Sequence, residues 1–240
     1  MNITPFEIFQ NHIYPNIDNS IKVTKVLIDN NSQVQFEVCS TKWLRVGDIL
    51  ADKKDNSGVF WEVTAIVSMS KVIGKRISHT DNLFYGELLY LPMPVLKSGT
   101  ERNLTGENSK FMKIGSLEPR PWIWCRENYT GGHLPKTAWG WKRLDYALYF
   151  VTDCNMVDQF NDQRHAEAVR PMQEVCDTTV ESIDNMSRVV RVGETRFKTF
   201  PILGNEDKTG MVSLLLDLKL AGVELLITVE VAKELCTKQC

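Results

Sequence analysis

The sequence predicts an α+β fold with a small, N-terminal antiparallel β-barrel-like unit. A C-terminal antiparallel sheet follows, with one long amphipathic helix on one face. Two observations indicate strands: short alternating segments separated by polar turns in the first third, and regular alternation of apolar residues near the C-terminus. Apolar residues at steps of three and four after residue 168 indicate the helix. The chain has 240 residues, enough to bury a full core, as one large domain or two small ones.

Residues 1–75 are expected to form a short helix followed by the barrel-like unit. Thr4 and Pro5 suit an N-cap and a first helical residue, and Pro15 ends the helix. After it the apolar period changes to two, which is the period of a half-buried strand. Strands are expected over residues 21–28, 33–38, 43–50 and 59–67. The polar turns between them predict hairpins and a small closed or half-closed barrel.

Residues 76–144 are expected to be a loop-rich, tryptophan-rich connecting segment. Proline and glycine punctuate it, and only residues 84–91 suggest a further strand. Residues 121–141, PWIWCRENYTGGHLPKTAWGW, hold four of the six tryptophans. The aromatic residues of this stretch are the candidate binding or interface residues: Trp122, Trp124, Tyr129, Trp139 and Trp141.

These aromatic residues have three possible uses. Trp122 and Trp124 are spaced by two, as are Trp139 and Trp141, so on strands each pair points to one face. A hairpin-like loop between the pairs would bring them together. The rings then form an internal seam between two parts of the chain, a contact with another protein, or a platform for a carbohydrate or other ligand.

Residues 145–240 are expected to form the α+β domain. A strand is expected over residues 146–151, and one long helix between Val157 and Asn185. Pro171 lies inside this span, so the helix either kinks or begins there. The predicted buried stripe is Val169, Met172, Cys176, Val180 and Ile183. Further strands are expected over residues 189–200, 214–220 and 223–231.

Composition argues against several classes of function. The net charge is −2, and the only basic cluster, Lys71–Arg76, is short and is interpreted as a strand end or turn, so direct nucleic-acid binding is unlikely as the main role. No window has the roughly 18 apolar residues of a membrane span, and the N-terminus is not a secretory signal. The six cysteines and four histidines show no zinc-ligand spacing, and no glycine pattern suggests a nucleotide loop. We therefore expect no metal, no cofactor and reduced, buried thiols.

No catalytic residue is assigned, and the chain is not expected to be an enzyme. Cys125 and His133 lie in one segment, but a catalytic pair usually comes from separate elements. Asp153, Asp158 and Asp162 are interpreted as charges at the start of the helix, where they meet its dipole. A hydrolase built on Cys125 and His133 remains the third hypothesis.

The order of elements after residue 145 resembles small structural proteins of tailed phages and prophages, of the head-to-tail connector and tail-completion type. The resemblance rests on the strand Asp145–Asn155, the segment Phe160–Met172, a helix, and β segments ending in a long amphipathic hairpin; it spans roughly residues 145–232. It implies a non-enzymatic virion component of the neck, connector or tail. Such a protein would be assembled in the host cytoplasm as a homo-oligomeric ring that contacts neighbouring virion proteins. The alternative is a glycan- or peptide-binding module that uses residues 121–141.

Overall fold

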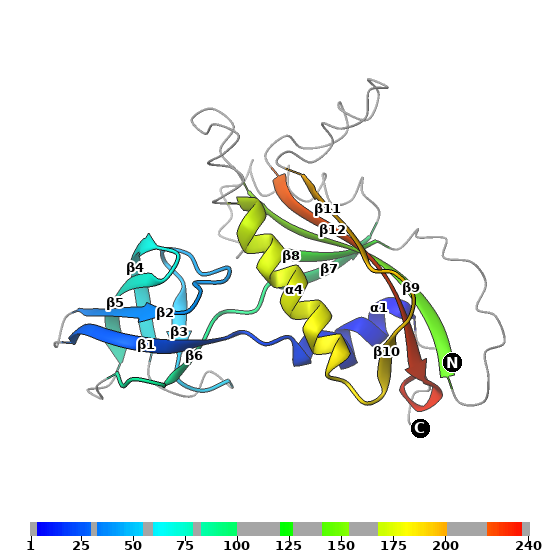
Figure 1. The fold of residues 1–240 in the computed structure, drawn as a ribbon, viewed down its shortest axis with the longest axis horizontal. Helices are drawn as coiled ribbons and strands as arrows, with labels where there is room; N and C mark the ends of the chain where they lie inside the picture. Colours follow the sequence, from blue (N-terminus) through cyan, green and yellow to red (C-terminus); the bar gives the residue numbers. More distant parts are fainter. Residues whose placement is uncertain are drawn as a thin grey trace, which may run out of the picture. The chain divides into compact units, whose positions relative to one another are not determined.

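The computed structural model describes residues 4–29, 33–54, 60–78, 83–99, 121–126, 141–153, 168–200 and 220–236. The chain is mostly β and divides into two compact units. One unit is Asp18–Met93, and the other combines Met1–Ile17 with Pro94–Cys240. We call them the barrel unit and the sheet unit (Figure 1).

The barrel unit is a closed barrel of six antiparallel strands, which confirms the predicted barrel. Its strands are β1 (Ser20–Asp29), β2 (Val34–Val38), β3 (Ile49–Ala51), β4 (Phe60–Ser68), β5 (Lys71–Ser78) and β6 (Leu88–Tyr90). They are arranged in the order β1-β2-β5-β4-β3-β6, and β6 closes the circle by pairing with β1. β1 pairs with β6 through residues 20–22 and with β2 through residues 23–29, where two register shifts bend the ladder.

Alternation along the strands builds the barrel core. Val34, Phe36 and Val38 are buried, whereas the residues between them are half-buried. Trp61 and Val63 on β4 are buried in the same alternating way. One set of alternate side chains therefore fills the interior, as expected for a small barrel.

The sheet unit begins with helical turns at the N-terminus. These are α1 (Pro5–Ile8), a π-helical turn η1 (Phe9–Ile13) and a 3₁₀ turn η2 (Tyr14–Asn16). Thr4 is the N-cap as predicted: its Oγ1 accepts from the Glu7 backbone N–H at 3.1 Å, and its own N–H donates to Glu7 Oε2 at 2.7 Å. This reciprocal pair satisfies two of the free donors at the helix start.

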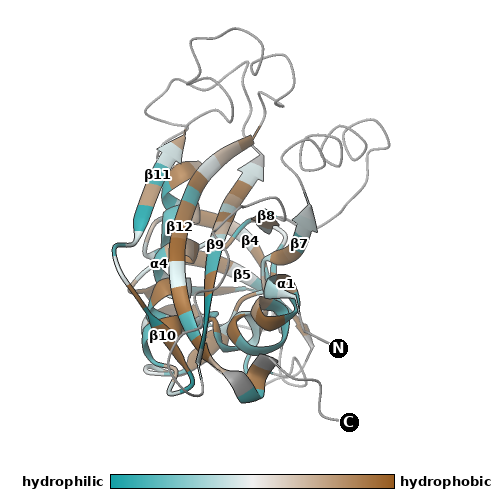
Figure 2. Cartoon of the chain, turned by 90° about the vertical axis from the view of Figure 1, so that its right-hand side faces the viewer, coloured by the Kyte–Doolittle hydropathy of each residue, from teal (hydrophilic) through white to brown (hydrophobic). Residues whose placement is uncertain are grey.

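The sheet itself has six strands: β7 (Val95–Gly99), β8 (Trp122–Arg126), β9 (Trp141–Asp153), β10 (Val189–Arg191), β11 (Arg196–Phe200) and β12 (Leu220–Ala232). The order is β10-β12-β9-β8-β7, and β11 also pairs with β12. β9 and β12 pair over the full 13-residue length of both strands. The β7–β8 pair is parallel, so the sheet is mixed and not purely antiparallel as predicted. Figure 2 shows the alternation of apolar and polar residues along β12.

One face of this sheet is covered by helical elements. Val223, Leu225 and Ile227 on β12 share that face with Tyr146 on β9, because directly paired residues point the same way. The Phe9 ring lies 5.7 Å from the Tyr146 ring, and Tyr146 Oη donates to the carbonyl oxygen of Pro5 at 2.8 Å. The helix α4 (Arg170–Asp184) packs against β9, β10 and β12 (Figure 1).

The unit boundaries differ from the predicted 1–75, 76–144 and 145–240. The N-terminal helix belongs to the sheet unit, and the barrel continues to Met93. The predicted connecting segment holds β6, β7 and β8, together with the end of β5 and the start of β9. β7 and β8 belong to the same sheet as β12, which lies far from them in the sequence, so local patterns do not reveal that these strands share a sheet.

The helix α4 has 15 residues, so the predicted long amphipathic helix is not confirmed. The expected start at Val157 lies outside the described residues. α4 carries Pro171 in its first turn, in agreement with the interpretation that the helix begins there. Of the strand expected over residues 214–220, the structure describes only Leu220, the first residue of β12.

The buried side of α4 differs slightly from the predicted stripe. Val169, Met172, Cys176 and Ile183 are buried, but Val180 is only half-buried. Val175 and Thr179 are buried in its place. A buried threonine is tolerated here because its Oγ1 donates to the carbonyl oxygen of Val175 at 2.8 Å. The helix is therefore rotated slightly from the orientation that apolar residues alone predict.

Candidate functional site

β8 positions the first half of the tryptophan-rich stretch inside the sheet unit. β8 lies between β7 and β9, and its Trp122 and Trp124 pair with Val151 and Tyr149 of β9. All four side chains therefore lie on the sheet face opposite to the one that carries Tyr146. Trp122 is fully buried and Trp124 is 2% exposed.

These indoles form the centre of a buried cluster. Tyr149, Val151, Phe200 and Leu220 complete it, and Val95 packs against it. The rings of Tyr149 and Phe200 meet edge to face at 6.4 Å, a favoured geometry for aromatic pairs. The cluster joins β8, β9, β11 and β12, so it holds the sheet together.

Polar contacts fix both indoles. Trp124 Nε1 donates to the carbonyl oxygen of Gly99 at 3.1 Å, which satisfies its only donor. Lys97 Nζ lies 4.5 Å from the Trp122 ring centroid, close enough for a cation–π interaction. The two tryptophans thus behave as packed core residues and offer no open face to a ligand.

The other candidates are placed differently. Trp141 is the first residue of β9 and is half-buried. It lies eight residues before Tyr149, a distance of about 26 Å along an extended strand, so it is far from Trp124. Tyr129 and Trp139 lie outside the described residues. The structure therefore does not bring Trp141 to Trp122 and Trp124, as the hairpin-like loop would have done.

The catalytic candidates are only partly described. Cys125 is 4% exposed on β8, and its side chain points to the face opposite Trp124. His133, Asp158 and Asp162 lie outside the described residues, and so does the side chain of Asp153. A nucleophilic thiolate needs access to substrate, and the burial of Cys125 does not provide it.

Three cysteines are described with free thiols: Cys39, Cys125 and Cys176. Cys125 and Cys176 are buried as predicted, but Cys39 is exposed just after β2. Burial and the nearby Asp177 carboxylate raise the pKa of Cys176 to about 12, so this thiol stays protonated and unreactive. Within the described ranges, no three His, Cys, Asp or Glu side chains gather in a group that could hold a metal ion.

The outer side of α4 carries a row of carboxylates. Asp184 accepts two hydrogen bonds from Arg191, at 2.9 and 2.8 Å. Burial, together with the nearby Glu181 and Glu174, raises the pKa of Asp177. On this helix face Asp184 forms an ion pair with Arg191, and the carboxylates of Glu181 and Glu174 repel that of Asp177.

The sequence analysis did not predict that large apolar side chains of the barrel unit would be exposed. Phe84 and Tyr85 are 65% and 78% exposed, although the sequence pattern predicts a strand over residues 84–91. The only signal was their position directly before Gly86, which marks a turn.

Comparison with known proteins gives no relative: no protein-family model, curated protein or solved structure matches the chain significantly. No helix among the described residues is long and apolar enough to cross a membrane.

Proposed function

We propose that the chain is a non-enzymatic structural subunit of a tailed-phage virion, part of a ring in the neck, connector or tail. It would act through contacts with copies of itself and with neighbouring virion proteins after assembly in the host cytoplasm. The observation that carries this proposal is the distribution of large apolar side chains. Trp122 and Trp124 are buried in the core of the sheet unit, whereas many large apolar side chains of the barrel unit are exposed. Such residues commonly mark protein–protein contacts.

The order of elements in the sheet unit also supports the proposal. The strand β9 is followed by α4, then by the short strands β10 and β11, and finally by the long strand β12. The order agrees with the resemblance to connector and tail-completion proteins as far as the helix and the β segments after it, but the hairpin expected from residues 214–220 and 223–231 is not found, because β12 runs without a break from Leu220 to Ala232. Likeness in the order of elements supports a fold more strongly than a function, so assembly must be tested directly.

The alternative functions lose part of their support. A glycan platform requires exposed rings, but two of its four indoles, Trp122 and Trp124, are buried. A hydrolase requires an accessible nucleophile, but Cys125 is buried on β8. Neither alternative has a described feature that favours it over assembly.

Mass photometry of the purified chain over a range of concentrations, followed by negative-stain microscopy, tests the proposal. We expect closed rings of one subunit number. A chain that stays monomeric at every concentration would contradict the proposal. A monomer that binds oligosaccharides in a glycan array would favour the binding-module alternative.

A further inference from the structure

One edge of the sheet in the sheet unit is formed by two short strands that follow one another in the sequence. β10 has three residues and β11 has five, and among the described strands both pair only with β12 (Figure 1). The outer side of such an edge presents backbone N–H and C=O groups that another strand can bind. An exposed edge is therefore a place where two copies of a chain can join.

The side chain of Phe197 favours such a pairing. Phe197 is 61% exposed on β11, and its neighbours Arg196 and Lys198 are exposed as well, so both faces of the strand reach solvent. When two β11 strands pair antiparallel about a two-fold axis, Phe197 of one copy can lie directly opposite Phe197 of the other. Aromatic side chains in opposite positions stabilise strand pairs. Without an opposing feature, this edge would favour self-association.

The charged residues beside Phe197 oppose that pairing. The two-fold axis brings together residues whose numbers are both even or both odd, because only side chains on the same face of the sheet can lie opposite each other. The register centred on Phe197 places Arg196 of each copy opposite Lys198 of the other, and the register that pairs all five residues places Lys198 opposite Lys198. Like charges directly opposite each other destabilise a strand pair.

Two acidic residues lie near these positive charges. Glu194 binds Arg196 at 3.1 Å, but the two side chains are 74% and 73% exposed, so water and salt screen this pair. Glu224 is the cross-strand neighbour of Lys198 on β12, on the side away from a second copy. It is therefore about 4.8 Å farther from an added strand than Lys198 is. Arg196 and Lys198 remain the charges that a strand at this edge would meet first.

A bulge between β10 and β11 also interrupts the edge. Between the pairs Arg191–Val229 and Arg196–Leu226, the edge has four residues, 192–195, and β12 has two. Additional residues on one strand bend it and break the regular row of backbone groups. A strand that binds this edge can therefore pair with β10 or with β11, but not with both in one continuous ladder.

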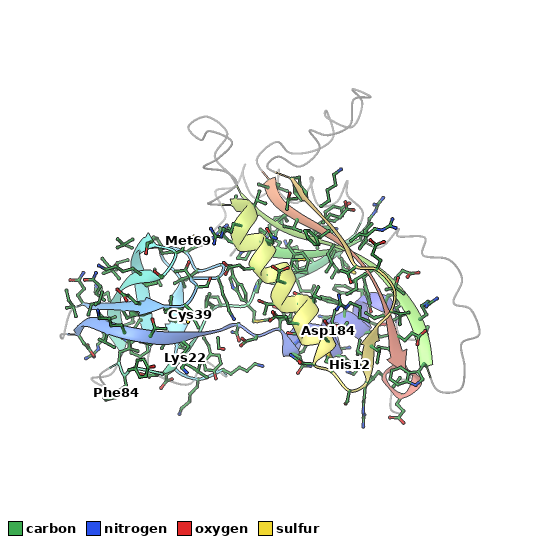
Figure 3. The ribbon with its side chains drawn as sticks, in the orientation of Figure 1. His12, Lys22, Cys39, Met69, Phe84 and Asp184 are labelled. Atoms are coloured by element: carbon green, nitrogen blue, oxygen red, sulfur yellow. The ribbon has the colours of Figure 1, made fainter. Side chains whose placement is uncertain are left out.

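Side-chain contacts hold the bulge in place. Arg191 Nε and Nη2 donate to the carboxylate of Asp184, the last residue of α4, at 2.9 and 2.8 Å; Figure 3 labels Asp184. Arg191 Nη1 also donates to Thr195 Oγ1 at 3.0 Å, so this side chain spans the bulge. Gly193 has φ +77°, a conformation that most other residues adopt only with strain. The interruption is therefore a fixed feature of the edge.

We propose that the edge formed by β10 and β11 is closed to strand addition by a second copy, through the charges of Arg196 and Lys198 and through the bulge between the two strands. Native sheets protect exposed edges with short strands, charged side chains and bulges, and this edge has all three. Contacts between copies then use other surfaces. The inference goes beyond the proposed ring and does not depend on it.

Charge reversal in the full chain tests the role of Arg196 and Lys198. R196E and K198E each place opposite charges across the register centred on Phe197, in two symmetric pairs. Each should therefore raise the association constant of self-association at least about tenfold over the parent. The double variant R196E/K198E again places like charges opposite each other and should return to the parent level. Sedimentation velocity over a range of concentrations measures these constants, and equal association of the single and double variants would overturn the role of the charges.

A shortened bulge tests the second feature. Deletion of Gly193 and Glu194 leaves two residues of the edge opposite two of β12, so a longer regular ladder becomes available. In the R196E background this deletion should raise the association constant further. Equal association with and without the deletion would overturn the role of the bulge. R196E without the deletion keeps the test of the edge decisive if the deletion prevents folding.

The matched control reverses a charge on a strand without an open edge. Lys75 lies on β5, which pairs with both β2 and β4 in the closed barrel. K75E changes the net charge by as much as R196E does, so it should leave self-association at the parent level. Hydrogen exchange should also locate the contact in R196E, with slower exchange of residues 196–200 as association increases. If K75E associates as strongly as R196E, or if residues 196–200 are not protected, the inference is overturned.

The outcomes for the edge and for the ring are separable. If the parent forms rings, R196E should add species larger than one ring. If the parent is monomeric, the ring proposal fails, and R196E should still form dimers. Slower hydrogen exchange of residues 196–200 in the assembled parent would show that assembly uses this edge, and the inference would be overturned while the ring proposal stands.

Discussion

The barrel unit and the sheet unit bury their apolar side chains in different ways. The barrel has one interior, so only one set of alternate residues along each strand is covered, and strand residues such as Ile49 and Val67 remain outside. In the sheet unit, residues 146–152 of β9 are buried one after another, which requires cover on both faces. The sheet unit is therefore the more deeply packed of the two units, and the barrel unit exposes more of its large apolar side chains.

The two units also differ in how their chain is connected. Within the barrel, β1 and β2, and β4 and β5, pair as neighbours in the sequence. In the sheet unit, β12 pairs with β9 across a long stretch of intervening chain. The helix α1, which belongs to the same unit, lies at the N-terminal end of the sequence. Long-range pairing is slow to form, so we expect the barrel to fold first and the sheet unit to depend on its central pair.

The largest effect is expected at that central pair. Gly222 on β12 lies against β9 so closely that a Cβ would overlap the carbonyl oxygen of Phe150. Because backbone atoms cannot move aside easily, Gly222→Val should lower the free energy of unfolding of the sheet unit by about 4 kcal/mol or more. Urea denaturation followed by circular dichroism measures this loss.

Gly193 is the matched control for Gly222. It has φ +77°, but no heavy atom lies within 4 Å of the position that a Cβ would occupy, so Gly193→Val meets strain without a clash. The expected loss is about 1–3 kcal/mol. Equal losses at the two positions would show that β9 and β12 tolerate separation, and the sheet unit would then lack a rigid centre.

Replacing one buried tryptophan in each unit allows the stabilities of the two units to be measured separately. Trp124→Ala removes a buried indole from the sheet unit and Trp61→Ala removes one from the barrel, so each should cost about 3–5 kcal/mol. If the units unfold independently, each variant lowers one transition in a thermal melt and leaves the other in place. Trp124→Phe keeps most of the packing and loses the bond to Gly99, so its loss should be clearly smaller.

A single transition lowered equally by Trp61→Ala and Trp124→Ala would mean that the two units unfold as one. The barrel unit and the sheet unit would then not have separate stabilities. A melt of Trp124→Ala identical to that of the parent would instead contradict the assignment of Trp124 to a core.

The helix α4 offers a finer test of packing. Val175 is buried against the sheet and Val180 is half-buried, although the sequence pattern predicts burial of Val180. Val175→Ala should lower the free energy of unfolding by about 1–2 kcal/mol, since the lost burial exceeds the better helix propensity of alanine. Val180→Ala should change it by less than about 0.5 kcal/mol. Chemical denaturation curves of both variants and the parent measure these losses. A larger loss at Val180 than at Val175 would support the burial of Val180 that the sequence pattern predicts.

Sequence patterns predicted the barrel well because its information is local. The alternation of Val34, Phe36 and Val38 and the polar turn before them were enough to identify the β1–β2 hairpin. Closure of the barrel was harder, because the short strands β3 and β6 are each only three residues long. Their pairing at Ala51 and Tyr90 depends on barrel geometry, which no local pattern records.

The sheet unit shows why the candidate site could be predicted only in part. The spacing of Trp122 and Trp124 correctly placed both side chains on one face of a strand. Whether that face is covered depends on Tyr149, Phe200 and Leu220, which come from other strands. Trp141 lies on β9, at the end far from the cluster, because the β8–β9 register begins at Trp122 opposite Val151.

The smallest expected effect concerns the outer face of α4, where the sheet unit carries charge in place of apolar groups. Burial and the carboxylates of Glu181 and Glu174 raise the pKa of Asp177, so the folded state binds this proton more tightly than the unfolded state. Ionised Asp177 therefore destabilises the fold above its raised pKa, and the penalty disappears as the pH falls below the ordinary carboxyl range. Asp177→Asn should raise the free energy of unfolding by about 0.3 kcal/mol at pH 7 and by nothing at pH 3. Asp184→Asn is the control with the opposite sign, because it removes the ion pair with Arg191 and one of the two acceptor oxygens, so it should lower stability slightly at pH 7. Urea midpoints measured at both pH values decide, and a loss of stability in Asp177→Asn at pH 7 would show that Asp177 has a stabilising partner.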